Sequence, residues 1–236
     1  MARLTRHQMK QDDLGAQLAA AMEFSLSHKR TIGLVALVSL GVVAIGLGSW
    51  LYVRSRQQQG AAAFEKALNT YHAPVLPAPP QMADLESYTT DTAKNTKALE
   101  AFQAVARDYS FYAVGRMARY YAAICLRDLE RYPEAEKEFQ ALSQLGDRRL
   151  ASLAKLGLAS VYALTNRPKD AEAIYKDLES NPTETVPKLT ALVARADLYR
   201  QTNAAEASAL YRQIQADYPN TPAADYAGAM LNLVPQ

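Results

Sequence analysis

The residues of this sequence that could take part in catalysis or metal binding are few and widely spaced. Its three histidines are His7, His28 and His72, and none has a ligand or base partner at a useful spacing. The single cysteine, Cys125, has no second cysteine with which it could form a disulfide or a Cys-X-X-Cys motif. We therefore expect solvated histidines, and a small core residue rather than a reactive thiol at Cys125.

Three glutamates, Glu134, Glu136 and Glu138, form an acidic cluster. They fall in the first turns of a predicted helix, where negative charge interacts favourably with the helix dipole. A metal site is the alternative interpretation. The sequence contains no Gly-X-Ser-X-Gly, His-Glu-X-X-His or glycine-rich phosphate-binding motif. It therefore predicts no catalytic residue, no metal ligand and no cofactor, and we expect a protein that is not an enzyme.

Composition and charge are those of a folded protein without a nucleic-acid partner. Of the 236 residues, 49% are hydrophobic and 21% are charged, and the formal net charge is +2. A dedicated nucleic-acid-binding protein normally carries a marked basic excess. The segment RMARYY at residues 116–121 mixes basic and aromatic side chains, but it belongs to a region whose charges balance. We expect no nucleic acid among the partners.

The first secondary-structure element that the sequence predicts from its composition is a membrane segment. Residues 31–53, TIGLVALVSLGVVAIGLGSWLYV, are 23 residues without a charge. As a helix they would extend about 34 Å, which covers a hydrocarbon core of roughly 30 Å. Trp50 and Tyr52 lie at one end, where aromatic side chains favour the membrane interface. The run is too long, and begins too far into the chain, for a cleaved signal peptide. It predicts a single transmembrane helix that contacts lipid.

The residues before the span, 1–30, are predicted to form a tail with an amphipathic helix, because Leu14, Leu18, Met22 and Leu26 recur at every fourth position. This helix could lie at the membrane surface or contact a cytoplasmic partner; a solvated tail is the alternative. Basic residues flank the span almost equally, with a slight excess over the whole tail. This favours a cytoplasmic N-terminus only weakly.

Two segments follow the span. Residues 54–72 are predicted to extend the membrane helix, because they are good helix formers with Ala63, Ala67 and Tyr71 in register. Residues 73–95 are predicted to form a flexible linker, because they begin with prolines and then lack any periodicity. The prolines of this linker are Pro74, Pro77, Pro79 and Pro80. A proline-rich recognition ligand is the weaker alternative, since no basic residue accompanies them.

Residues 96–236 contain a repeat with a spacing of 37, 36 and 36 residues. In each unit, one helix carries an alanine, an aromatic residue four positions later, and an aliphatic residue three positions after that. The alanines are Ala98, Ala135, Ala171 and Ala207. The aromatic residues are Phe102, Phe139, Tyr175 and Tyr211, and the aliphatic residues are Val105, Leu142, Leu178 and Ile214.

The preceding helices repeat as well. Their small residues are Ala123, Ala159 and Ala196, followed three positions later by Leu126, Tyr162 and Tyr199. Pro133 and Pro168 fall near the first turn of the helix that follows, where a missing N–H is tolerated. A small side chain lets two antiparallel helices approach, and an aromatic ring fills the adjacent space. One such hairpin cannot bury its own apolar face, but a stack of hairpins can.

In this pattern, from about Thr96 to Val234, the sequence resembles the tetratricopeptide repeat (TPR) family. It departs from the family in lacking the usual glycine in the helix turn, and Arg119 and Lys155 occupy the tryptophan position. The resemblance implies an all-α protein, in which an N-terminal transmembrane helix precedes a TPR-like α-solenoid. The solenoid would contain about three to four helical hairpins and a C-terminal capping helix within residues 96–236.

The order of tail, span and repeats is similar to that of YfgM-like single-span inner-membrane proteins. This second resemblance implies a bacterial inner-membrane protein with a cytoplasmic N-terminus and a periplasmic repeat domain. It also implies Sec translocon components and periplasmic chaperones as partners. The expected function is that of a protein-binding scaffold, an accessory factor for secretion or envelope protein folding. The alternative is a structural subunit of a larger membrane complex, packed through Gly41, Gly46 and Gly48 of the span.

The TPR resemblance implies a concave groove, lined by the first helix of each unit, that binds a helix or an extended peptide. Carrying over the family's groove positions gives Met117, Tyr120, Ile124, Arg127, Asp128, Leu153, Leu156, Ser160, Thr190, Val193, Asp197 and Arg200. The two-carboxylate clamp of cytosolic chaperone-binding repeats needs Lys and Asn where this chain has Tyr120 and Ile124. We therefore do not expect that class of partner. A groove that is merely solvated, or that packs on itself, is the alternative.

Overall fold

The computed structural model describes residues 29–77 and 86–233. Every regular element in these ranges is an α-helix, which confirms the expected all-helical class. The amphipathic helix predicted within residues 1–30 lies almost wholly outside the described residues. The chain divides into two compact units, residues 1–56 and residues 57–236.

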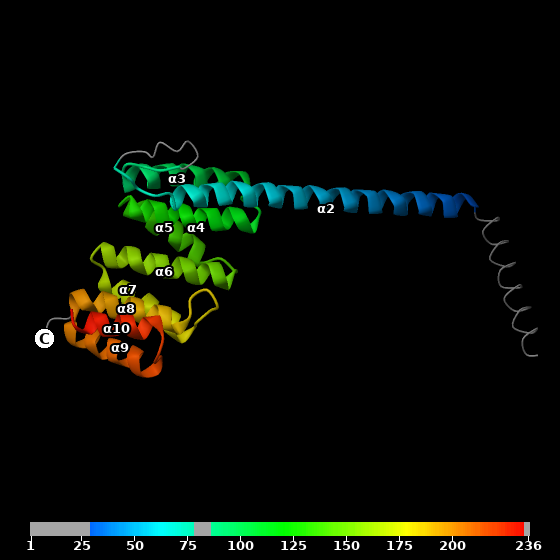
Figure 1. The fold of residues 1–236 in the computed structure, drawn as a ribbon. Helices are drawn as coiled ribbons and strands as arrows, with labels where there is room; N and C mark the ends of the chain where they lie inside the picture. The colour runs from blue at the N-terminus through cyan, green and yellow to red at the C-terminus, as the bar shows by residue number, and fades with distance from the viewer. Residues whose placement is uncertain (1–28, 78–85, 234–236) are drawn as a thin grey trace, which may run out of the picture. The chain divides into compact units, whose positions relative to one another are not determined.

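Helix α2, Lys29–Tyr71, contains the whole apolar run (Figure 1). Among the described residues it is the one helix that is long and apolar enough to cross a membrane. The described apolar side chains of this run are exposed; Leu37, for example, is 73% exposed. Exposed aliphatic surface is unfavourable in water, so this run is consistent with a single membrane-spanning segment.

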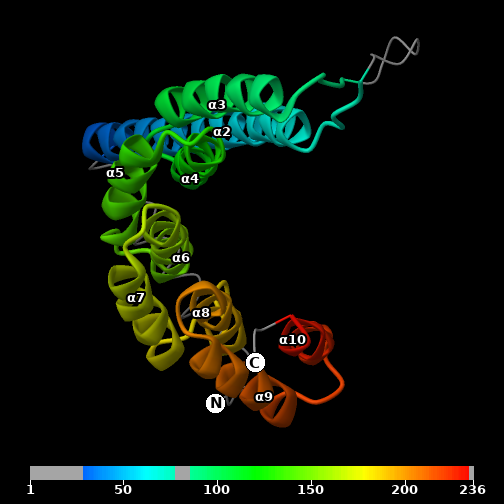
Figure 2. The same ribbon diagram turned by 90° about the vertical axis from the view of Figure 1, so that its left-hand side faces the viewer.

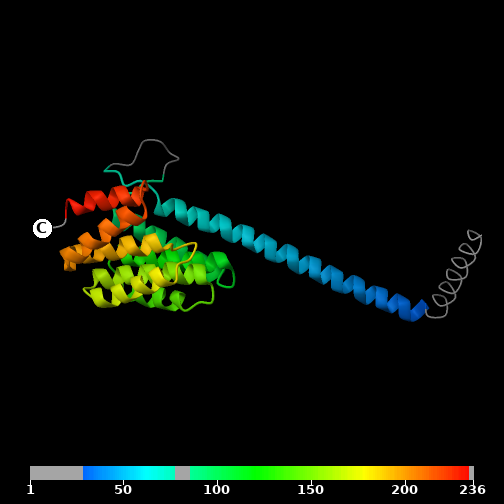
Figure 3. The same ribbon diagram turned by 90° about the horizontal axis from the view of Figure 1, so that it is seen from below.

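The second unit is built from consecutive helices that pack each on the next. After α2 they are α3 (Asp91–Asp108), α4 (Ala113–Asp128), α5 (Tyr132–Ser143), α6 (Arg148–Leu164), α7 (Pro168–Ser180), α8 (Lys188–Thr202), α9 (Ala204–Asp217) and α10 (Pro222–Leu231). Figure 2 shows that these helices follow an arc, with α4, α6 and α8 on its inner side and α5 and α7 on its outer side. Figure 3 shows the same helices lying side by side.

Local sequence explains where these helices begin and end. Pro133, Pro168 and Pro222 each lie in the first turn of a helix, where no N–H is needed. The turns that close α4 and α6 contain Glu130 and Asn166, which have positive φ angles of 60° and 57°. Both residues adopt the left-handed backbone conformation, which a glycine would adopt without strain.

The residues at the repeat spacing form the core of the unit. Ala98, Ala135, Ala171 and Ala207 are completely buried in α3, α5, α7 and α9. The aromatic and aliphatic residues that follow them are buried as well, with exposed fractions of 5% or less. Ala123, Ala159 and Ala196 are completely buried in α4, α6 and α8. Antiparallel helical hairpins therefore stack through one recurring contact set.

The C-terminal part of α2 belongs to this core. Ala67 is only 1% exposed, and the ring of Phe64 lies 5.6 Å from that of Phe102 and 5.5 Å from that of Tyr121. Gly60 permits the close approach, because a Cβ atom there would lie 2.9 Å from Tyr109 Cδ1 and from a methyl carbon of Val114. Residues 57–71 thus pair with α3 as the first hairpin of the stack.

The segment between α2 and α3 is anchored at both ends, although residues 78–85 lie outside the described part. Tyr88 N donates to Pro74 O at 3.0 Å, and Leu76 N donates to Tyr88 O at 2.8 Å. The α3 helix starts at Asp91, within the range that the sequence assigns to the linker, because the Thr90 hydroxyl accepts a hydrogen bond from Ala93 N.

Candidate functional site

Cys125 and His72 are the described residues among the thiol and imidazole groups of the chain, whereas His7 and His28 lie outside the described ranges. Cys125 is completely buried, and burial together with the charge of Asp128 raises the pKa of its thiol to about 12. A thiol with that pKa is not a nucleophile near neutral pH. His72 lies in the turn after α2.

The glutamate cluster forms ion pairs rather than a metal site. Arg131 donates to Glu134 at 2.6 Å, Arg167 donates to Glu136 at 3.0 Å, and Arg119 pairs with Glu138. Within the described residues, no group of three or more His, Cys, Asp or Glu side chains could hold a metal ion. The last two pairs tie α5 to the α6–α7 turn and to α4, so these charges connect helices.

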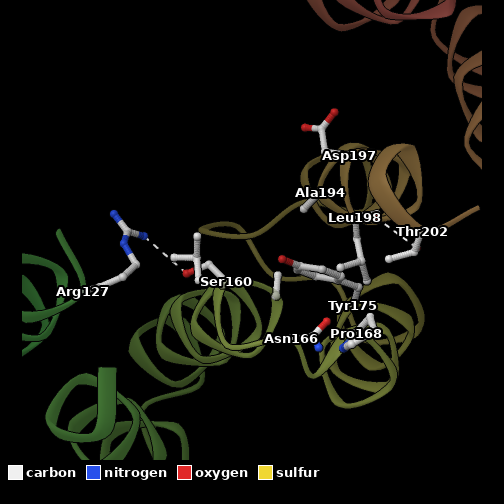
Figure 4. A pocket seen from close by; sticks show the side chains of 11 residues that line it. Arg127, Ser160, Asn166, Pro168, Tyr175, Ala194, Asp197, Leu198 and Thr202 are labelled. Carbon is white, nitrogen blue, oxygen red and sulfur yellow. Dashed lines mark hydrogen bonds between the residues drawn. The ribbon is translucent and has the colours of Figure 1, made fainter. Parts of the chain in front are cut away.

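A pocket of about 470 Å³ opens where α4, α6, α7 and α8 meet (Figure 4). Four of its residues come from α6 and the turn after it, and four from α8. Its walls are Arg127, Ser160, Ala163, Leu164, Asn166, Pro168, Tyr175, Ala194, Asp197, Leu198 and Thr202. The pocket therefore lies within the stack, toward the C-terminal ends of the inner helices α4, α6 and α8.

One repeat position of the inner helices differs from interface to interface, and at the third interface it lines the pocket. Two residues before the buried alanines of the inner helices stand Tyr121, Gly157 and Ala194. Tyr121 stacks on Phe102, the aromatic residue of the preceding helix, with 5.2 Å between ring centres. At Gly157, an added Cβ would lie 2.5 Å from the ring of Phe139, so the backbone itself packs against that ring.

At the third interface the equivalent residues, Ala194 and Tyr175, both line the pocket. Tyr121 fills the space beside its ring, and Gly157 lets its ring pack directly on the helix backbone. The methyl group of Ala194 is too small to fill the space and too large to allow that direct contact. Tyr175 extends across the cavity in Figure 4, and burial and the charge of Asp197 raise its pKa to about 12. Its hydroxyl is therefore a neutral hydrogen-bonding group at physiological pH.

On one wall, Arg127 is held in place by its neighbours. Its Nε and Nη2 donate to Asp128 Oδ1 at 3.0 and 2.8 Å, and its Nη1 donates to Ser160 Oγ at 3.4 Å. The Tyr71 hydroxyl at the end of α2 donates to Asp128 Oδ2 at 3.2 Å. This chain of contacts fixes a guanidinium at the pocket wall and connects it to α2.

On the opposite wall, the Asp197 carboxylate is held by two tyrosines. Tyr211 donates to Asp197 Oδ1 at 2.6 Å, and Tyr226 donates to the same atom at 2.8 Å. Burial first, and then the hydrogen bond to Asp197, raise the pKa of both hydroxyls. The pocket thus presents a cation and an anion on facing walls.

The twelve groove positions expected from the sequence are only partly brought together. Arg127, Ser160 and Asp197 line the pocket, and Asp128 supports Arg127. Three residues of α4 lie half-buried against the core: Met117, Tyr120 and Ile124. Three further residues lie half-buried against the smaller clusters around α7, α8 and α9: Leu153, Leu156 and Val193. Thr190 and Arg200 are exposed.

Several lining residues were not expected from the sequence, notably Tyr175, Thr202 and Asn166. Tyr175 was assigned to the repeat core alone, whereas it is both a core ring and a pocket wall. The signal that could have located the pocket is Ala194, where the first unit carries a tyrosine. Sequence reasoning considered the groove helices one at a time and did not compare the residues facing each aromatic ring.

The lining of the pocket offers both apolar and polar groups to a ligand. The described lining has apolar walls at Leu164 and Leu198, hydroxyl and amide groups, and one charge of each sign, but no histidine or cysteine. Such a pocket can accept a side chain or a turn of a peptide, whose polar groups pair with Arg127 and Asp197. No protein-family model, curated protein or solved structure matches this chain.

Proposed function

We propose that the protein is a membrane-anchored scaffold that binds segments of other proteins on the inner face of its helical stack. One observation carries the proposal. A single helix, α2, contains both an apolar run that needs a membrane and residues that form the first hairpin of a stack with a pocketed inner face. The protein is thereby a fixed binding surface next to a bilayer, and no enzymatic step is part of its role.

The stack is proposed to be a TPR-like solenoid. The support is the recurrence of alanine, aromatic and aliphatic residues at fixed spacing, all buried in α3, α5, α7 and α9. The α10 helix covers α9 at the end of the stack, as a capping helix would. The order of tail, span and repeats supports a YfgM-like role as an accessory factor near the Sec translocon, with secreted proteins or periplasmic chaperones as partners.

The proposed location is the bacterial inner membrane, with the N-terminus in the cytoplasm and the C-terminal unit in the periplasm. A pair of reporter fusions after Gln236 tests this orientation. One reporter is active only in the periplasm and the other only in the cytoplasm. Activity of the periplasmic reporter alone is expected. Activity of the cytoplasmic reporter alone would reject the assigned topology, because the stack would then face the cytoplasm.

The binding role is tested by crosslinking in living cells. A photoreactive amino acid replaces Thr202 in the pocket wall, and a control carries it at Ala173, an exposed residue of the outer helix α7. Crosslinks to translocon components or to a range of secreted proteins are expected from Thr202 and not from Ala173. Equal labelling from both positions would contradict a specific inner-face site. If the protein were instead found in a single stoichiometric complex, held through its apolar run, the result would support the alternative that it is a structural subunit of a larger membrane complex.

A further inference from the structure

The two charges on the walls of the pocket are not equivalent, because one of them already has a charged partner. The Arg127 guanidinium forms an ion pair with the Asp128 carboxylate, with 2.8 Å between Nη2 and Oδ1. The partners of Asp197 among the described residues are the hydroxyls of Tyr211 and Tyr226, which carry no charge. The pocket wall and its support therefore hold two carboxylates against one guanidinium.

The Asp197 carboxylate is fixed in place, and one of its oxygens is left for a ligand. Tyr211 and Tyr226 come from α9 and α10 and both donate to Oδ1, at 2.6 and 2.8 Å, and their rings pack edge to face. A carboxylate oxygen accepts about two hydrogen bonds, so Oδ1 is fully used. The hydrogen bonds of the described residues leave Oδ2 available. A carboxylate held in this way loses little conformational freedom when a ligand binds.

Tyr175 lies across the cavity and responds to both charges. Burial is the main cause that raises the pKa of its hydroxyl to about 12, and the charge of Asp197 is the next. The charge of Arg127 acts in the opposite direction and less strongly. Arg200, three residues after Asp197 in α8, is exposed and does not line the pocket. The electrostatic field in the pocket therefore favours a cation.

The apolar part of the lining suits the stem of a long basic side chain. The α8 helix contributes Leu198 together with Asp197, and α7 and α6 add the ring of Tyr175 and the side chain of Leu164 (Figure 4). Lysine and arginine bury their aliphatic stems along apolar surface while the charged end reaches a polar partner. The volume of about 470 Å³ is typical of ligand pockets, which measure about 300–1,000 Å³.

We propose that the pocket selects protein segments through one basic side chain, a lysine or an arginine, whose charged end pairs with Asp197 and whose stem lies on Leu198 and the ring of Tyr175. An acidic side chain is disfavoured, because it would meet an arginine that is already paired and an aspartate that is not. The inference rests on the binding role proposed above and names the chemistry that the same pocket recognises.

The test compares three short fluorescent peptides of alanine and leucine that differ only in their central residue, which is lysine, norleucine or glutamate. Norleucine has the stem of lysine without its charge. Binding to the full-length protein in bilayer discs of phosphatidylcholine is measured by fluorescence anisotropy. This lipid has no net charge and so does not attract the basic peptide, and empty discs provide the blank.

For wild type, we expect the lysine peptide to bind most tightly, followed by the norleucine and then the glutamate peptide. Asp197→Asn removes the charge but keeps an oxygen that can accept the tyrosine hydroxyls. It should weaken the lysine peptide by about tenfold and leave the norleucine peptide unchanged. Asp217→Asn is the matched control, because Asp217 is an exposed residue of α9 outside the lining. It should bind as wild type does, and circular dichroism establishes that both variants are helical.

Equal binding of the lysine and norleucine peptides by wild type would overturn the inference without the need for any variant. A preference for lysine that survives in Asp197→Asn would also overturn it, since the cation would then bind elsewhere. In either case, weaker binding by Ala163→Trp, which places an indole in the pocket, would leave the proposed binding role intact. Absence of binding by all three peptides would overturn the inference, and the crosslinks from Thr202 would decide the binding role separately.

Discussion

Tyr121, Gly157 and Ala194 occupy one position of the repeat, and the size of this side chain decides what lies beside the preceding aromatic ring. A ring stacks there at the first interface, bare backbone packs there at the second, and a pocket opens at the third. The repeated residues themselves could be recognised from the sequence, because their spacing is regular. The pocket could not, because it depends on which ring each residue faces in the folded stack.

The reactivity of the Cys125 thiol tests the packing of the core at the residue scale. It is the single cysteine of the chain and is completely buried, with a thiol pKa raised to about 12. The folded protein should therefore not react with a thiol reagent such as dithiobis-nitrobenzoate, whereas one equivalent should react after unfolding in guanidinium chloride. Rapid labelling of the folded protein near pH 8 would show that the core around α4 is open.

Tyr175 provides a second test through the pH dependence of stability. Its pKa is raised from 10.0 to about 12, so the stability contributed by its neutral form is complete below pH 10 and is lost as the pH rises to about 12. Between pH 10 and about 12, the free energy of unfolding of the Tyr175→Phe variant should fall by less than that of wild type, with a difference of up to about 2 kcal/mol. Urea unfolding at several pH values measures this. Identical pH curves for the two proteins would contradict a buried, shifted hydroxyl.

At the scale of elements, α2 continues beyond the apolar run to Tyr71, as the sequence predicts, and the main difference is that its C-terminal part packs on the repeats. The 54–72 extension and the repeats are separated by a proline-rich segment in the sequence, which suggests two independent parts. In the structure, Phe64 and Ala67 pack on α3 and α4, and α2 provides the first helix of the first hairpin. The sequence could not show this, because Phe64 and Ala67 lie outside the regular spacing and their partners follow only after the linker.

Close packing of α2 on the α3–α4 turn predicts a strong effect at Gly60. The Gly60→Leu substitution should cost about 1–3 kcal/mol of stability, since an added Cβ would already lie 2.9 Å from two side chains. Gly146→Leu is the control, because no atom lies within 4 Å of a Cβ built there. The free energy of unfolding in urea is measured for both variants. Equal effects would mean that α2 does not pack at Gly60.

The contact between α7 and α8 predicts a second contrast. Arg195 and Glu179 lie 2.9 Å apart with side chains only 13% and 12% exposed, and burial raises the pKa of Glu179. Arg195→Ala should destabilise the fold by about 3 kcal/mol, because it leaves a buried carboxylate unpaired. Replacing both partners, as Arg195→Met with Glu179→Leu, should recover most of that loss.

The surface pair Arg131–Glu134 is the matched control for this experiment, because both side chains are about half exposed. Arg131→Ala should leave the unfolding midpoint in urea nearly unchanged, since an exposed ion pair contributes little. If Arg195→Ala were as mild as Arg131→Ala, the α7–α8 pair would be solvated rather than buried.

At the scale of the whole molecule, the sequence establishes that the chain is helical and has an apolar run long enough to cross a membrane. Which residues form a binding surface follows only from the stack. Arg127 and Asp197 belong to α4 and α8, which have three helices between them in the sequence, and both side chains line the same pocket (Figure 4). Six of the twelve expected groove residues instead lie half-buried against the core clusters.

The central claim is that the pocket on the inner face binds other proteins, and filling it is the most direct test. Ala163→Trp places an indole in the pocket, and Ala173→Trp places one on the outer helix α7 as the control. In both full-length variants, crosslinking in cells is measured from a photoreactive residue at Thr202. Loss of the crosslinks with Ala163→Trp and their retention with Ala173→Trp is the predicted result. Undiminished crosslinking with Ala163→Trp, in a variant that remains helical, would contradict the account.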